Sequence, residues 1–302
     1  MAITLFTNSS AMSASNALQK ANSTLSSAME NLGTGKRINK ASDDAAGLQV
    51  ATRLQGQTNG MAVAQRNIAD ASTMLQTGEG AMDEVSNIMY RMKDLATQGA
   101  TDTNTADSRK AIDTEMDSLK TELNSIMGNT SYAGNKLFSD TTKDGKTTTA
   151  KMGAEMTFQT GSESGETTKV DVSSQLKSVM GSISSLSGAT VSDTTTKADD
   201  GTTSTTTGTT NANALIDTLN SALDNVSSLR SSFGASINGL SHASANLTNM
   251  KDNTDQALGN IQDADFASEA SKMTRSQMLA QTSTSMLKQS NSMSSLVMSI
   301  LG

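Results

Sequence analysis

The sequence predicts a mainly α-helical protein: a long antiparallel helical bundle, or coiled-coil rod, formed by both chain ends, with a small β-hairpin region in the middle. Apolar residues recur every seven positions over long stretches, which is the spacing of a coiled-coil seam. Proline, which interrupts helices, is absent from the 302 residues, whereas average usage would supply roughly fifteen. Aromatic residues make up only 2%, which favours narrow helical seams over a compact core.

The first helix is expected to end at Gly33-Thr34-Gly35, because glycine allows the left-handed geometry that terminates helices. A basic loop over residues 36–40 follows. Ser42 is interpreted as the N-cap of the next helix, with Asp43 and Asp44 in its first turn, where carboxylates complement the helix dipole. The apolar line of the first helix consists of Leu18, Leu25 and Leu32, with Ala21 and Ala28 beside it.

Residues 61–99 predict one unbroken helix of about 58 Å, at ~1.5 Å per residue. Its two apolar lines are Met61, Ile68, Leu75, Met82 and Met89, and Ala64, Ala71, Gly78, Val85 and Met92. A polar turn over residues 101–107 leads to an antiparallel partner helix. The apolar residues of that partner are Ile112, Met116, Leu119, Leu123 and Ile126.

The helical period is lost in the middle of the chain. Residues 156–159 and 169–172 alternate as two strands around a polar turn and predict a β-hairpin within about 139–175. Residues 186–211 are rich in threonine and have almost nothing to bury. We therefore expect them to form an exposed loop or a disordered insertion.

Residues 212–262 predict a helix of about 76 Å, at ~1.5 Å per residue. One of its lines is Leu219, Val226, Phe233, Leu240, Leu247, Thr254 and Ile261, in which only Thr254 is polar, and the companion line is Ala222, Leu229, Ala243, Met250 and Ala257. Asp263 is interpreted as the N-cap of a last helix. That helix carries Phe266, Met273, Ala280 and Leu287, flanked by Leu279, Met286, Met293 and Ile300. Its apolar face has little to cover it within one chain, which predicts contacts with other copies.

Composition argues against several classes of protein. A formal charge of −7 disfavours nucleic-acid binding, which needs a concentrated basic face. There is no cysteine and one histidine, His242, so no cofactor, metal site or catalytic group is expected, and the chain is not expected to be an enzyme. Gly78-Glu-Gly80 lacks the strand and the Lys-Ser/Thr ending of a phosphate loop. We expect neither a Sec signal peptide nor a membrane-spanning segment.

Several motifs, in order along the chain, resemble those of the bacterial flagellin family. They are the run from Leu32 to Leu48 (LGTGKRINKASDDAAGL), Gln65 to Ala71 (QRNIADA), Gln76 to Ala81 (QTGEGA), Ile261 to Glu269 (IQDADFASE) and Met278 to Gln281 (MLAQ). The resemblance covers nearly all of the chain outside about 140–212, so the chain is similar to a short-form flagellin, of a possible lateral type.

The resemblance implies a structural subunit of the extracellular flagellar filament, used for motility. It implies that residues 1–42 and 262–302 form a terminal coiled-coil filament core. Residues 43–185 and 212–261 would then form an α-helical rod domain, with 186–211 as an exposed insertion. The residues expected to carry polymerisation are Leu18, Leu25, Leu32, Phe266, Met273, Leu279, Met286, Leu287, Met293 and Ile300.

The partners that the resemblance implies are other copies of the chain, in a helical homopolymer, and the flagellar type III export apparatus, an export chaperone, the filament cap and the hook-junction proteins. The stretch from Tyr90 to Gln98 is similar to the surface by which Toll-like receptors recognise many flagellins. It implies an innate immune contact at Arg91, Asp94, Leu95 and Glu115.

Three other interpretations are weaker. A hook–filament junction protein shares similar terminal helices, but the density of flagellin-like motifs at both ends argues against it. A hydrolase carried by the middle insertion lacks candidate catalytic residues. A chemoreceptor stalk would require a membrane segment.

Overall fold

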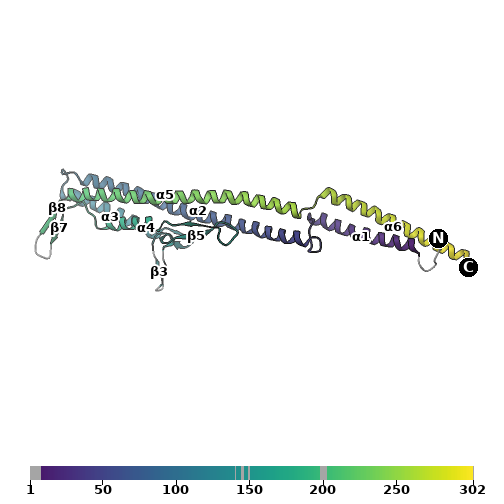
Figure 1. Cartoon of the computed structure of the whole chain (residues 1–302). Coiled ribbons are helices and arrows are strands. Elements are labelled where there is room, and N and C mark those ends of the chain that lie inside the picture. Colours follow the sequence, from purple (N-terminus) through teal and green to yellow (C-terminus); the bar gives the residue numbers. More distant parts are fainter. Residues whose placement is uncertain (1–7, 140, 144–145, 149, 198–202, 302) are drawn as a thin grey trace. The chain divides into compact units, whose positions relative to one another are not determined.

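The computed structural model describes residues 8–139, 141–143, 146–148, 150–197 and 203–301 (Figure 1). Among these residues the chain forms six α-helices, a short 3-10 helix (η1, Lys151–Gly153) and four two-stranded antiparallel sheets. The mainly helical fold class with a small β region is therefore confirmed. The helices are α1 (Ser9–Thr34), α2 (Ala45–Gly99), α3 (Ala106–Asn129), α4 (Ser173–Ser187), α5 (Gly208–Gln262) and α6 (Phe266–Leu301).

The chain divides into two compact units. The terminal unit contains Met1–Thr58 and Lys251–Gly302, and the central unit contains Asn59–Met250. The sequence predicts domain limits after residue 42 and before residue 262. These limits separate a filament core from a surrounding domain, and they stay a prediction.

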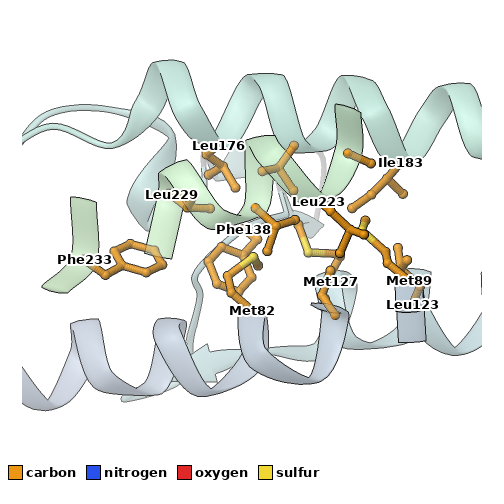
Figure 2. Packing of buried hydrophobic residues seen from close by; sticks show 14 of the residues in the cluster. Met82, Met89, Leu123, Met127, Phe138, Leu176, Ile183, Leu223, Leu229 and Phe233 are labelled. Carbon is orange, nitrogen blue, oxygen red and sulfur yellow. The ribbon is translucent and has the colours of Figure 1, made fainter. Parts of the chain in front are cut away.

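The central unit has a continuous hydrophobic core built by four helices. On α2 and α5, Gln65 Nε2 donates to Thr248 Oγ1 (3.0 Å) and Arg230 pairs with Asp83 (2.9 Å). The two pairs lie equally far apart along each helix, so α2 and α5 keep one antiparallel register. Figure 2 shows core side chains of α2, α3, α4 and α5 converging: Met82, Met89, Leu123, Met127, Leu176, Ile183, Leu223, Leu229 and Phe233.

The seven-residue lines expected for residues 61–92 are buried in this core. On α5 the line from Leu219 to Leu247 is buried as well. The companion line of α5 departs from expectation at Met250 and Ala257, which are both exposed. Leu247 is the last residue of α5 in the core. A seven-residue period identifies one side of a helix, but it does not show how far along the helix other elements pack against that side.

Four hairpins interrupt the helices. Their strands are β1 (Ser131–Tyr132) with β2 (Asn135–Lys136), β3 (Thr141–Lys143) with β4 (Lys146–Thr148), β5 (Met156–Gln159) with β6 (Thr167–Val170), and β7 (Thr194–Lys197) with β8 (Thr203–Thr206). The expected hairpin is β5–β6, but its second strand ends at Val170 because Asp171 Oδ1 accepts hydrogen bonds from the backbone and hydroxyl of Ser173, where α4 begins.

The Thr-rich insertion also differs from expectation. Its residues 194–197 and 203–206 pair as β7 and β8 and do not form a loop or a disordered segment, while residues 198–202 lie outside the described residues. Threonine is β-branched and favours extended backbone even where it has little to bury.

Asp113 of α3 holds the segment that leads into β7. Its carboxylate accepts from Thr190 Oγ1 (2.6 Å), from the N–H groups of Val191 (2.8 Å) and Ser192 (3.1 Å), and from the Ser192 hydroxyl. Burial alone would raise the pKa of Asp113. The hydrogen bonds from Ser192, Thr190 and the two N–H groups outweigh burial and hold this pKa below its ordinary value.

Replacing Asp113 by Asn is expected to lower the free energy of unfolding by about 1.5–3 kcal/mol at pH 7, because hydrogen bonds to a charged acceptor are lost. A lowered pKa stabilises the fold above the ordinary Asp pKa of ~3.9, and this contribution is lost as the pH falls through the lowered value. Urea unfolding followed by circular dichroism should therefore show the difference at pH 7 and a smaller one near pH 3. Glu122→Gln, at an exposed position of the same helix, is the control. Equal stability of D113N and the parent at pH 7 would contradict the assignment.

Candidate functional site

Helices α1 and α6, called here the terminal helix pair, lie side by side and antiparallel within the terminal unit (Figure 1). Their buried residues are small or polar and recur every seven positions: Ala14, Ala21 and Ala28 on α1, and Glu269, Ser276 and Ser283 on α6. Side chains of this size let two helix backbones approach closely. The hydrogen bond from Asn8 Nδ2 to Ser290 Oγ (2.7 Å) ties the pair near the chain ends.

The large apolar side chains of the pair are therefore left at its margin or outside it. Leu18, Leu25, Leu32, Met273 and Leu287, all expected from the sequence, are half-buried. The other expected residues are exposed, from 52% for Leu279 through Met286 and Met293 to 69% for Phe266. Ile300 lies in α6, but its side chain is outside the part that the structure describes.

Among the described side chains of the pair, three exposed large apolar residues were not identified from the sequence. Met12, Met29 and Met278 are each more than half exposed, and they lie off the seven-residue lines that pointed to the other positions. They could have been predicted as large apolar residues on the otherwise polar side of an amphipathic helix.

The turn between α1 and α2 is built from the motif that begins at Leu32. Gly35 ends α1 with a positive φ of 71°, and its N–H donates to Asn31 O (2.8 Å). Ile38 is buried, and Gly47 leaves room for it, since a Cβ at Gly47 would lie 2.8 Å from Ile38 Cδ1. The motif therefore specifies a chain reversal with its own small core.

Two aspartates stabilise this turn in a way that corrects the sequence interpretation. Asp44, and not Ser42, caps α2, because Asp44 Oδ1 accepts from Gly47 N (2.8 Å). Asp43 precedes the helix and accepts from the N–H groups of Lys40 and Asn39. These hydrogen bonds hold the pKa of Asp43 below its ordinary value.

The break between α5 and α6 lies beside the first turn. Arg37 N donates to Gln262 O (2.7 Å), Ala264 N donates to Gly35 O (3.0 Å), and the Arg37 guanidinium donates to Ile261 O (2.8 Å) at the carboxyl end of α5. A cation is favourable at this end of a helix. The cap of α6 is Asp265, which accepts from Ala267 N (3.0 Å). The expected cap, Asp263, instead forms a bridge with Lys36.

The residues expected to contact an immune receptor lie on α2 and α3 in the central unit. Arg91 donates to Glu115 Oε1 through Nε (3.0 Å) and Nη2 (2.6 Å). Arg91, Glu115 and Asp94 are exposed. Leu95 is buried in the core, so it supports this surface from below and does not present its side chain to a partner.

The remaining candidates from the sequence are His242 and the Gly78-Glu-Gly80 segment, and metal binding was a further question. The described residues contain no group of three or more His, Cys, Asp or Glu residues that could hold a metal ion. His242 is exposed on α5, and Gly78 lies inside α2 against Met152 and Phe233. Among the described helices, none has an apolar stretch long enough to span a bilayer.

Known proteins match the chain along most of its length. Residues 5–143 match the family model of the bacterial flagellin N-terminal helical region, and residues 216–301 match that of the C-terminal helical region. Over the full length of both chains, the sequence is 34% identical to flagellin B and 31% identical to flagellin A of Vibrio anguillarum.

A solved structure is also similar in fold. It is that of a Vibrio parahaemolyticus protein assigned as flagellar hook-associated, with a TM-score of 0.54 and 19% identity over 73% of this chain and 100% of that chain. At this identity the likeness concerns the fold alone.

Enlarging the buried line of the terminal helix pair should weaken the pairing. A leucine at Ala21 is expected to cost about 1–3 kcal/mol, through overpacking between the two backbones. Because the chain has no cysteine, an N8C/S290C disulfide reports the pairing, and adding A21L should lower its yield at equilibrium by roughly fivefold or more. Non-reducing electrophoresis of dilute protein measures this yield. Ala17→Leu, at an exposed position of α1, is the matched control, and equal yields for the two variants would contradict the close-packed seam.

Proposed function

The chain belongs to the bacterial flagellin family and is a structural subunit of the extracellular flagellar filament, not an enzyme, and we propose that it polymerises through its terminal helix pair. The observation that carries this proposal is the size difference between the buried and the exposed residues of the pair. Alanine, serine and one glutamate are buried, while Phe266, Leu279, Met286 and Met293 are exposed.

Burial of these side chains supplies the driving force of polymerisation. Covering one large apolar side chain stabilises an assembly by about 1.5–3 kcal/mol. Within one chain the pair buries mainly alanine and serine side chains, which contribute little. A neighbouring copy that covers the exposed face therefore stabilises both the contact and the helix pairing, so ordering is coupled to assembly. Contacts that do not close into a ring extend into an open helical filament.

We assign the roles in the filament according to the predicted domains. Residues 1–42 and 262–302 form the filament core, and residues 43–185 and 212–261 form the surrounding domain, which carries the 186–211 segment with its β7–β8 hairpin. The contrast in packing supports this division, because the core of the central unit is large and apolar while the terminal helix pair is incompletely covered.

Further partners are proposed from family membership. They are the flagellar type III export apparatus, an export chaperone, the filament cap and the hook-junction proteins. The absence of cysteine suits export as an unfolded chain, because no disulfide has to form or persist. The hook-junction role itself is the second candidate function. Electron microscopy of the purified protein separates the two, since a junction protein by itself should not form long filaments.

Polar substitutions on the exposed face should block assembly and leave the chain folded. In the variant L279S/M286S/M293S the buried line of α6 is intact, but at least three large apolar contacts are lost. The critical concentration for polymerisation should rise by more than about tenfold, given about 1.5–3 kcal/mol for each side chain. Sedimentation and electron microscopy measure it. The control Tyr90→Ser removes an exposed aromatic residue of the central unit and should assemble normally. Normal filaments formed by the triple variant would contradict the proposal.

We also propose that a Toll-like receptor of the host recognises the surface formed by Arg91, Asp94 and Glu115, with Leu95 beneath it. Arg91→Ala should reduce receptor activation by monomer about fivefold or more, because a hydrogen bond that involves a charged group contributes about 1.5–3 kcal/mol. A reporter-cell assay measures this. Arg230→Ala is the matched control, since Arg230 also pairs with a carboxylate of the central unit. Equal activation by the parent and R91A would refute the assignment.

A further inference from the structure

We infer that the terminal helix pair carries a peroxide-sensitive modification site: the outer methionines Met12, Met29, Met278, Met286 and Met293, whose oxidation to sulfoxide blocks assembly of the free subunit. This inference rests on the proposed function, because it requires that these residues be covered by a neighbouring copy. The oxidation state of these methionines would then determine which subunits can join the polymer.

The methionines of the terminal helices and those of the central unit differ strongly in solvent exposure. The outer methionines are 52–64% exposed. In the central unit most methionines belong to the hydrophobic core, and Met82, Met89, Met92, Met116 and Met152 have no measurable exposure. Of the described central-unit side chains, only Met180 (41%) and Met250 (42%) are methionines counted as exposed. An oxidant in solution therefore meets the thioethers of the terminal helices first.

No thiol competes for the oxidant. The chain has 19 methionines and no cysteine, so the thioether is its only sulfur group. A peroxide transfers one oxygen atom to it: a sulfur lone pair attacks one peroxide oxygen, an S–O bond forms, and the O–O bond breaks. The oxygen that leaves takes the proton from the transferred oxygen and departs as water or an alcohol. The sulfur is oxidised by two electrons and the peroxide is reduced by two.

The product changes the exposed face chemically. A sulfoxide is polar and accepts hydrogen bonds, whereas the thioether is apolar and flexible. Covering a sulfoxide without a donor opposite it carries the penalty for burying an unpaired polar group. Met286 and Met293 follow Leu279 at seven-residue intervals on α6, so oxidation places two such groups on one line of the face. The change is reversible, since methionine sulfoxide reductases restore the thioether with electrons from thiols.

The test uses the full chain and dilute hydrogen peroxide on unassembled protein. Peptide mass spectrometry should find sulfoxide at the outer methionines before the buried ones. The oxidised chain should show a critical concentration at least about tenfold higher, the size expected from burying an unpaired polar group. Treatment with methionine sulfoxide reductase and dithiothreitol should return it to the starting value.

Two variants separate the outer methionines from the others. A chain with leucine at all five outer positions should show the same critical concentration after peroxide treatment as before it, whatever its starting value, because leucine cannot be oxidised. The matched control M180L/M250L replaces the two exposed methionines of the central unit and should remain as sensitive as the parent.

Each outcome bears on the inference in a defined way. Oxidised parent protein that assembles normally overturns it, as does loss of assembly in the peroxide-treated five-leucine chain. Both results leave the proposed function standing, provided that L279S/M286S/M293S fails to assemble. If that triple variant assembles normally, the proposed function fails, and the inference fails with it.

Discussion

The terminal helices depend on one packing constraint: the residues buried between α1 and α6 are small. Alanine on α1 and serine on α6 let the two backbones approach closely, and this approach leaves no room between them for leucine, methionine or phenylalanine. The large side chains must therefore lie at the margin or outside. The fully buried line therefore contributes little to stability, the half-buried leucines contribute part of their area, and the exposed residues gain only from contact with another copy, as we propose for polymerisation.

The central unit has the same seven-residue period as the terminal helices, but it buries its apolar residues within the chain. Its core contains many large side chains, contributed mainly by four helices, so much of the apolar surface is covered within the chain. Polar pairs such as Asp83 with Arg230 and Gln65 with Thr248 set the register of α2 and α5. This unit also carries the exposed surface around Arg91 and the Thr-rich hairpin.

Helix ends in the terminal unit are specified by short polar motifs. Gly35 stops α1 by its left-handed geometry, while Asp44 and Asp265 start α2 and α6 by accepting N–H groups. Backbone hydrogen bonds between residues 35–37 and 262–264 then hold the two breaks together. The family signature at Leu32 to Leu48 has a physical meaning here, because Gly35, Ile38, Asp43, Asp44 and Gly47 each have a role in the reversal.

The sequence by itself determined the long helices α2, α3 and α5 and most of their buried lines, because a seven-residue period over many turns is a property of local spacing. It also located the turns at Gly35 and near residue 264, through glycine and aspartate. Prediction from the sequence missed β1–β2, whose strands have two residues each, and it missed β3–β4 and β7–β8, whose threonines gave no contrast between faces. It also missed α4, although the buried residues of that helix recur at helical spacing. Only the tertiary structure decided that the alanine line of α1, and not its leucine line, is buried, and that Met12, Met29 and Met278 are exposed. A period identifies the candidate faces of one helix, but which face is covered depends on the sizes of the side chains on its partner.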